Sequence, residues 1–529
     1  MVGSSDRGAT RAVAGSRALQ PSDFSFDGFG DLRRDELRKI LRLGIRTGDP
    51  TVSVVDDAVF IPGSAAAGNG QPKYTGGIVN AEGRAIDTAQ MHRKGGKRVG
   101  GLAESVNVAP EREIDEDVIY LGLLFNHYGR VLLESLARVW YLDRVDPSAK
   151  VVFNSANAAQ GGIAPWLPDL LSLFGISPER IVHLNTPTRL RKAIVPEPLF
   201  EQFYSAHEEM VQPFREVAAR VAGDVTPSAQ PLYLSRRRLS SRQRPIIGES
   251  DLEEVLRAEG FRIAYPETMS LENQVRMINS HADIVSSLGS AAHSILFALH
   301  RPRLHLLASR DDIPGNYFLC SALADAPTTF VDCLGAGGRV TANDERLNRR
   351  AESFENEAKV RPTDLDAGPQ SMPQLLDIPR AVDYLAQQGL AGPRPEIPAE
   401  SPGRSLQNQF DEAWLFARVR KASTKSTLPE AIAAEATALA ATSWPLSLML
   451  ARYYARARDT ARADEMAEQF VTLVAAETNV DRLAYYRGDV RGLAGRIVRA
   501  CRPEIADRLN QVLADRFPPD SGDSEDAQD

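Results

Sequence analysis

Between residues 231 and 309, short apolar strands alternate with amphipathic helices. PLYLS, FRIAYP, DIVSSLG and RLHLLAS have the character of strands, and DLEEVLRAEG, SLENQVRMINSHA and SAAHSILFALH have that of helices. This order leaves few folds open, because strands that alternate with crossover helices form parallel sheets covered by helices. We therefore expect an α/β fold with a Rossmann-like domain in this part of the chain.

A less regular alternation precedes it. TVSVVDDAVFIP, GGIVNAEGRAIDTAQ and DVIYLGLL are typical of strands, with AEGRA at 81–85 as a hairpin loop. A helix is expected from just after Gly129, followed by VVFN, the helix PWLPDLLSLFG, IVHLN, AIVPEP and a helix near 206–222. The polar segment GDVTPSAQ joins this half to the next. Two Rossmann-like domains that face a cleft are the predicted arrangement.

The remaining segments differ in composition. A Pro-rich linker follows the second α/β half, and the chain then becomes rich in Ala, Arg, Glu and Leu, with helices expected near 408–422, 429–441, 444–457, 460–476 and 481–516. We found no second clean copy of a repeat in this helical appendage. The predicted domains are a disordered N-terminus (1–22), an N-terminal α/β domain (23–225), a second α/β domain (226–365), a linker (366–403), a helical domain (404–516) and a disordered acidic tail (517–529).

Charge and composition exclude several classes of protein. With 529 residues, a net charge of -8 and 43% hydrophobic residues, the chain has the composition of a globular protein and is too acidic overall for a nucleic-acid binder. The three cysteines have neither zinc-site nor disulfide-framework spacing. We recognise no secretory signal and no apolar run of about 18 residues. We expect a cytoplasmic protein, whose association with the inner face of the cell membrane, if any, is peripheral.

A first polar block, NHYGRVLLESLARVW, lies where a strand ends and a helix begins. Ligands of α/β proteins bind at this edge of a sheet. His127 could take up a proton near neutral pH, and Glu134 lies about two turns into the helix on a largely apolar face. The alternative is that Asn126 caps the helix and that Glu134 is a partly solvated helix residue.

A second block, LYLSRRRLSSRQR at 232–244, places five arginines directly after a strand. Guanidinium groups bind phosphate oxygens in pairs and stay charged, so they suit a diphosphate. Arg236 and Arg237, nearest the strand, are the two that we expect to point inward. The alternative is a solvated basic loop.

A third block, DIVSSLGSAAHSILFAL at 283–299, joins an apolar strand to a helix through small residues. Free N–H groups at such a helix start bind anions, and Ser287, Gly289 and Ser290 allow a diphosphate to approach closely. His293 would face the same place from the first turn. Alternatively, Ser290 is an ordinary N-cap and His293 a core or surface histidine.

Taken together, these blocks resemble glycosyltransferase family 61, which includes bacterial capsular polysaccharide biosynthesis proteins. The resemblance rests on SRR at 235–237, Glu249 in GESDLEEVL, the segment 260–299, NYF at 316–318 and the block NHYGRVLLESLARVW, with GGIVNAEGR similar to the family's N-terminal hairpin. It covers about 55–330 and leaves the helical appendage without a counterpart. Leu288 departs from the pattern, because a polar residue is expected before the Gly-Ser pair.

The resemblance implies an inverting enzyme of GT-B type that transfers a sugar from a nucleotide-sugar donor, without a bound metal or other cofactor, to a glycan or lipid-linked glycan. It makes 226–365 the donor-binding domain and 23–225 the acceptor side. Glu134 is the preferred base and His127 the other candidate. The donor candidates are Arg236, Arg237, Glu249, Glu267, Ser287, Gly289, Ser290 and His293, and the acceptor candidates are Asn126, Tyr128 and Arg130. Glu249 could equally be a helix-start residue that complements the helix dipole.

Two classes of function remain open. The first is a glycosyltransferase of surface polysaccharide synthesis, in capsule or a related glycan. The second is a non-catalytic scaffold that binds glycan or nucleotide within an assembly complex. In either case the helical appendage is expected to serve self-association or docking to partners.

Overall fold

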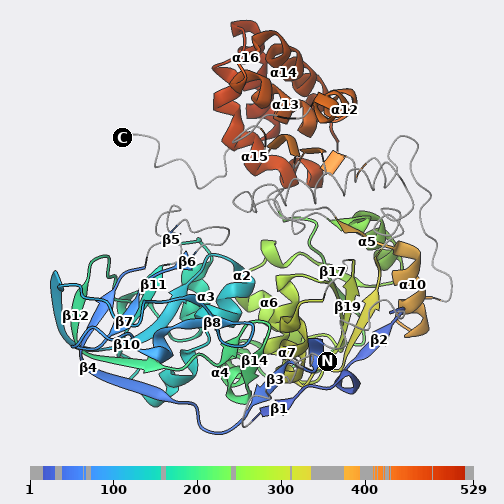
Figure 1. Cartoon of the computed structure of the whole chain (residues 1–529). Helices are drawn as coiled ribbons and strands as arrows, with labels where there is room; N and C mark the ends of the chain where they lie inside the picture. Colours follow the sequence, from blue (N-terminus) through green and yellow to red (C-terminus); the bar gives the residue numbers. More distant parts are fainter. Residues whose placement is uncertain are drawn as a thin grey trace, which may run out of the picture. The chain divides into compact units, whose positions relative to one another are not determined.

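The structure, a computed structural model, describes residues 16–29, 39–63, 65–66, 73–155, 163–239, 246–309, 313–334, 374–392, single positions and short stretches between 409 and 428, 430–478 and 480–518. The chain divides into two compact units (Figure 1). The first unit comprises Met1–Leu234 and Gly260–Asp332, and the second comprises Ser235–Glu259 and Cys333–Asp529. The first unit therefore contains residues of both predicted α/β domains.

A six-stranded sheet of the first unit contains the strands of the regular alternation. Every pair of neighbours in it is parallel, in the order β17-β15-β18-β19-β20-β2. Its five later strands, numbered along the chain, have the doubly wound order 2-1-3-4-5, with a switch point between β15 and β18. The predicted parallel sheet is thus confirmed. Its strands are β2 (Ser25–Asp27), β15 (Leu232–Leu234), β17 (Arg262–Ala264), β18 (Asp283–Ser287), β19 (Arg303–Ala308) and β20 (Thr328–Asp332).

Helical segments connect these strands along the chain. α6 (Leu271–Asn279) precedes β18, the 3-10 helix η10 (Ser290–Phe297) follows it, and α7 (Gly315–Ala324) precedes β20. SAAHSILF was expected to be an ordinary helix, and this expectation is corrected by the tighter 3-10 form. α5 (Glu249–Ala258) belongs to the second unit.

The earlier half forms a mixed sheet instead of the expected parallel one. In the order β11-β10-β12-β4-β7, β10 is parallel to β11 and β12, whereas β4 is antiparallel to β12 and β7. The strands are β4 (Val52–Ile61), β7 (Gly77–Val79), β10 (Arg112–Leu124), β11 (Lys150–Ser155) and β12 (Thr188–Pro196). The hairpin at AEGRA is confirmed by pairing of Val79 with Ala85, but IVHLN makes only a single bridge, between Ile181 and Val151.

Two smaller sheets complete the strands of the first unit. One has the order β1-β3-β14-β13, with β1 (Ser16–Ala18), β3 (Gly44–Arg46), β13 (Phe200–Glu201) and β14 (Ser205–His207). The other has the order β5-β6-β9-β8, with β5 (Ala65–Ala66), β6 (Lys73–Tyr74), β8 (Met91–Arg93) and β9 (Lys97–Gly100). Because β1 pairs with β3, the expectation of disorder up to residue 22 is wrong for these residues. Residues 1–15 lie outside the described part.

One continuous apolar core connects the six-stranded and the mixed sheet. Phe174 follows α3 (Leu167–Leu173), Phe214 lies in α4 (Gln212–Ala222), and Phe297 ends η10. The Phe214 ring centroid is 5.1 Å from those of both Phe174 and Phe297. These aromatic contacts, within one cluster of buried residues, make the two sheets parts of a single packed body.

The second unit contains the helical appendage. α12 (Glu430–Ala440), α13 (Trp444–Arg456), α14 (Thr460–Ala475), α15 (Val480–Val498) and α16 (Pro503–Arg516) share one buried core (Figure 1). The single helix expected over 481–516 is two helices, because Pro503 lacks an N–H and is favoured at a helix start. The positions described between 409 and 422 are all helical, in agreement with the helix expected near 408–422, and residues 519–529 lie outside the described part.

The expected linker at 366–403 contains regular structure. β21 (Gln374–Leu375) pairs in parallel with β16 (Ile246–Ile247), and α10 (Ile378–Gln387) follows. In the described part of the chain, no helix combines the length and the apolar character needed to cross a membrane.

Candidate functional site

Two polar blocks that are far apart in sequence meet in the first unit. Tyr128 begins the short helix α2 (Tyr128–Arg130), and its hydroxyl hydrogen-bonds that of Ser294 in η10 at 2.9 Å. A Cβ on Gly129 would lie 2.8 Å from the Cβ of Ser290 and 3.0 Å from Nδ1 of His293. Only glycine therefore allows this approach without displacement. The structure thus brings three predicted site residues together: Tyr128, Ser290 and His293.

His293 is buried at this meeting point. Burial lowers its pKa to about 3, with a smaller contribution from the charge of His127, so the imidazole is neutral at physiological pH. Within the described residues, neither ring nitrogen has a hydrogen-bond partner. The ring instead contacts Tyr317, with centroids 5.1 Å apart. An imidazole buried without partners is costly, which is a common property of functional groups.

His127 and Asn126 differ in their surroundings. His127 is exposed at the N-cap of α2, where its side chain makes no capping bond. The Asn126 side chain accepts a hydrogen bond from the N–H of Ala164 at 3.0 Å, so the interpretation of Asn126 as a helix cap is wrong. Burial raises the pKa of Tyr128 to about 12, which leaves its hydroxyl neutral.

Glu134 lies in a π-helical turn, η4 (Val131–Ser135), and is buried between two arginines. Arg93 of β8 donates through Nε and Nη2 to the two carboxylate oxygens, both at 2.8 Å. Arg130 donates through Nε at 2.7 Å and also lies over the ring of Phe125. The alternative of a partly solvated glutamate is therefore wrong. Each carboxylate oxygen of Glu134 already accepts a hydrogen bond from an arginine. A proton that binds to one oxygen would displace the hydrogen bond made there.

The residues after β18 lie at the switch point of the parallel sheet. Ser287 is fully buried and lies 3.3 Å from the hydroxyl of Tyr233 in β15. Gly289 is the N-cap of η10, so the alternative that Ser290 is the cap is wrong. Leu288, which replaces the expected polar residue, is buried, and its N–H donates to the carbonyl of Leu307.

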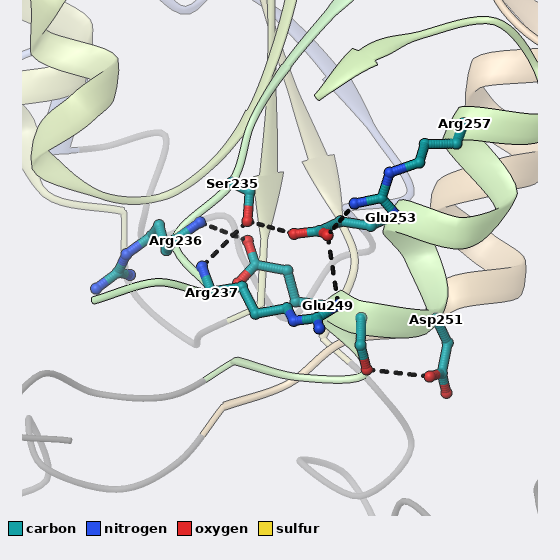
Figure 2. A network of polar contacts seen from close by, with 8 residues as sticks. Ser235, Arg236, Arg237, Glu249, Asp251, Glu253 and Arg257 are labelled. Atoms are coloured by element: carbon teal, nitrogen blue, oxygen red, sulfur yellow. Dashed lines mark hydrogen bonds and ion pairs between the residues drawn. The ribbon is translucent and has the colours of Figure 1, made fainter. Parts of the chain in front are cut away.

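The loop after β15 belongs to the second unit and is fixed by a buried glutamate that the sequence did not single out. Glu253 of α5 accepts hydrogen bonds from the hydroxyl of Ser235 at 2.5 Å and from Arg257 at 2.8 Å. It also pairs with Arg237 at 3.4 Å (Figure 2). The guanidinium of Arg237, expected to bind a diphosphate, is thus held by an acid of its own unit.

Glu249 has a similar anchoring role toward Arg236. It is buried at the first position of α5, and its carboxylate accepts the backbone N–H of Arg236 at 3.0 Å. In Figure 2 the guanidinium of Arg236 points away from Glu249 and Glu253. The helix-start alternative for Glu249 is confirmed in position, and its carboxylate faces the backbone.

The remaining candidates lie apart from these clusters. Glu267 is exposed on the 3-10 helix η9 (Pro266–Thr268) of the first unit. Arg242 and Arg244 fall outside the described residues. Among the residues that are described, no group of three or more His, Cys, Asp or Glu side chains is arranged to hold a metal ion.

Two residues that pair with predicted site residues were not identified from the sequence: Arg93, which pairs with Glu134, and Glu253, which pairs with Arg237. Arg93 precedes Glu134 by 41 residues and lies in β8, whereas Glu134 lies in the π-helical turn η4, so no local pattern relates them. Glu253 could have been found from the sequence. It follows Glu249 by four residues, one helical turn, in GESDLEEVL, so the two side chains lie on the same face of α5.

Together, a doubly wound sheet and a polar cluster after its switch-point strand define an α/β protein, and the carboxyl edge of such a sheet is where α/β proteins bind ligands. Residues 128–304 match the family model described as Glycosyltransferase 61. This segment of the chain is thus similar to glycosyltransferase family 61, and the match supports a glycosyltransferase domain there. No curated protein matches the chain.

Proposed function

We propose that the chain is an inverting glycosyltransferase that moves a sugar from a nucleotide-sugar donor to a hydroxyl of a glycan acceptor, without a bound metal, in the synthesis of capsule or another surface polysaccharide. The contact of Gly129 with Ser290 and His293 is the observation that carries this proposal. This contact brings the block NHYGRVLLESLARVW, which contains the candidate bases His127 and Glu134, next to the block DIVSSLGSAAHSILFAL, whose residues suit a phosphate. Inverting transfer needs both kinds of group, a base for the acceptor hydroxyl and donors for the departing phosphate.

For the donor, the proposal assigns Ser287, Gly289, Ser290 and His293 in the first unit. A neutral His293 offers one N–H to a phosphate oxygen, and the backbone N–H groups at the start of η10 supply others. Arg236 and Arg237 remain donor candidates by the family resemblance, and Arg237 with Glu253 sets the shape of its own loop. Glu249 and Glu267 remain candidates for sugar or ribose hydroxyls.

For the acceptor, Glu134 remains the proposed base and His127 the other candidate. Glu134 must exchange a hydrogen bond with Arg93 or Arg130 to take a proton, whereas His127 is exposed. Asn126, Tyr128 and Arg130 are the proposed acceptor contacts. A pH profile of kcat in His127→Gln separates the two bases, because a histidine base gives an ionisation near neutral pH that this variant lacks.

Release of nucleoside diphosphate from nucleotide sugar and acceptor tests the proposal. We expect Glu134→Gln and Arg236→Ala to lose at least 100-fold in rate. Glu209→Gln and Arg17→Ala, which alter surface ion pairs only, serve as matched controls and should keep the wild-type rate. Donor binding by thermal shift without turnover on any acceptor would favour the non-catalytic scaffold instead.

Two further measurements test the finer points. An excess of chelator should leave turnover unchanged, and a loss that is restored by Mg²⁺ or Mn²⁺ would contradict metal independence. NMR of the first product formed should show an anomeric configuration opposite to that of the donor. Retention of configuration would exclude a single inverting displacement.

A further inference from the structure

A pocket of about 220 Å³ lies in the first unit, between the mixed sheet and the segment after β12. Glu134 forms part of the wall of this pocket. None of the other predicted site residues lines it. The wall also includes Arg46, His92, Tyr120, Arg138 and Glu197.

Arg138 is the unusual member of this lining. It is buried, 3% exposed, and its Nε and Nη2 donate to the carbonyls of Pro196, Thr88 and Gln90. Over the described residues, Nη1 has no hydrogen-bond partner and no carboxylate lies within 4 Å of the guanidinium. Burial lowers the pKa of Arg138 to about 10, so the group stays charged at neutral pH. One N–H donor group is thus left for a ligand.

A bulge in β10 makes room for this guanidinium. The pairing register of β10 shifts between Tyr120 and Leu123. Gly122, inside the bulge, has φ +88, and a Cβ there would lie 2.5 Å from Nη1 of Arg138. Bulges of this kind are common beside binding sites, where they re-aim or admit a side chain.

Two of the carboxylates that line the pocket are already paired with arginines. Glu134 is held by Arg93 and Arg130, and Glu197 accepts from Arg46 at 3.1 Å and from the hydroxyl of Thr51 at 2.8 Å. An anion would face these carboxylates and a cation would face the guanidinium groups. A neutral molecule with several hydroxyl groups can accept from Arg138 and donate to the carboxylates.

We propose that this pocket binds a neutral sugar ring, that of the acceptor, with Arg138 Nη1 donating to one hydroxyl and Glu134 accepting from another. The assignment rests on the proposed glycosyltransferase activity and specifies its acceptor class. It also provides Glu134 with an acceptor hydroxyl, because that carboxylate is part of the pocket wall.

Saturation-transfer NMR on the full chain tests the proposal with methyl glycosides of glucose, galactose and mannose as neutral probes and methyl glucuronide as the anionic probe. We expect saturation of at least one neutral glycoside and a weaker signal from the glucuronide. His92→Trp, which fills the pocket from a partly exposed wall, and Arg138→Lys should each reduce the neutral signal at least tenfold.

Arg180→Lys is the matched control, because Arg180 is also a buried arginine that donates to backbone carbonyls, those of Ala149 and Gly175, but it does not line the pocket. It should keep the neutral signal. If circular dichroism shows that Arg138→Lys is unfolded, His92→Trp decides alone. The proposal is overturned if no neutral glycoside is saturated, if the glucuronide gives the stronger signal, or if the folded pocket variants retain full saturation.

A thermal shift with nucleotide sugars on the same samples keeps this test apart from that of the proposed function. Donor stabilisation that survives in His92→Trp while glycoside saturation is lost supports the pocket. If the wild-type chain binds glycosides but no nucleotide sugar changes its melting temperature, the result contradicts the proposed nucleotide-sugar donor and still supports the sugar-binding pocket.

Discussion

Gly129 occupies a position where one methyl group changes the packing of two elements. Its Cα faces Ser290 and His293, and both would be within 3.0 Å of an added Cβ. The neighbours are parts of a backbone-anchored 3-10 helix, so they cannot give way as a flexible side-chain tip would.

Gly129→Ala should therefore lower the free energy of unfolding by about 1–3 kcal/mol through overpacking. It should also weaken donor binding, because α2 and η10 would separate. Chemical denaturation measures the first effect and thermal shift the second. Gly488→Ala in α15, where a Cβ meets nothing within 4 Å, is the control and should stabilise by about 0.4–1 kcal/mol.

His293 makes folding stability depend on pH. Its pKa is about 3 in the folded chain and about 6.5 when unfolded, so only the unfolded state takes up the proton in between. Stability contributed by the neutral ring is complete above pH 6.5 and falls toward pH 3, with a slope of up to about 1.4 kcal/mol per pH unit. His293→Phe should flatten this slope between pH 6.5 and 4.

Urea denaturation at several pH values measures how the free energy of unfolding of the wild type and of His293→Phe depends on pH. At pH 7.5 the phenylalanine variant should be at least as stable as the wild type, because it removes two unpaired buried nitrogens. A slope equal to that of the wild type would show that His293 is protonated in the folded chain.

At the scale of elements, the sequence predicts best where the pattern is local. Alternating strands and helices were sufficient for the parallel sheet that contains β15 and β18, because strands connected by crossover helices pair in parallel. The antiparallel β4 was not predictable in this way, because its partner β12 lies more than a hundred residues later. The π-helical form of Val131–Ser135 also follows from packing and not from periodicity.

The same distinction applies to the site. The residue types that surround a phosphate or a hydroxyl could be found from their position after a strand, as with Ser290 and His293. Their partners could not be found in this way. Glu134 of η4 pairs with Arg93 of β8, 41 residues earlier, and Arg138 reaches the pocket only because the bulge at Gly122 makes room for it. Side chains that converge from distant segments leave no spacing to recognise.

The loop after β15 depends on α5 through one acid. Glu253→Gln should lower the free energy of unfolding by about 1–3 kcal/mol, because the buried carboxylate loses its charge-assisted hydrogen bonds while the partly exposed Arg237 and Arg257 remain solvated. Glu254→Gln, a change of the exposed neighbouring residue, should remain within about 0.5 kcal/mol of the wild type. Thermal denaturation of both variants checks this, and equal stabilities would contradict the network.

At the scale of the whole molecule, the two units have separate apolar cores. Phe214 lies in the core of the first, and Trp444 is buried in the helical core of the second. Phe214→Ala and Trp444→Ala should each cost about 3–5 kcal/mol, but in different thermal transitions. Differential scanning calorimetry distinguishes them, and a shift of one common transition by both variants would show that the units unfold as one.

The pairing of β2 with β20 has a consequence for the order of folding. Ser25 pairs with Thr329, so the edge strand β2 leaves the ribosome about 300 residues before its partner β20. The two strands are far apart in sequence. The chain between them must lose the entropy of loop closure before the hydrogen bonds between the strands can stabilise the sheet. β2 therefore stays unpaired in this sheet until β20 has been synthesised, and its docking completes the sheet as a late step of folding.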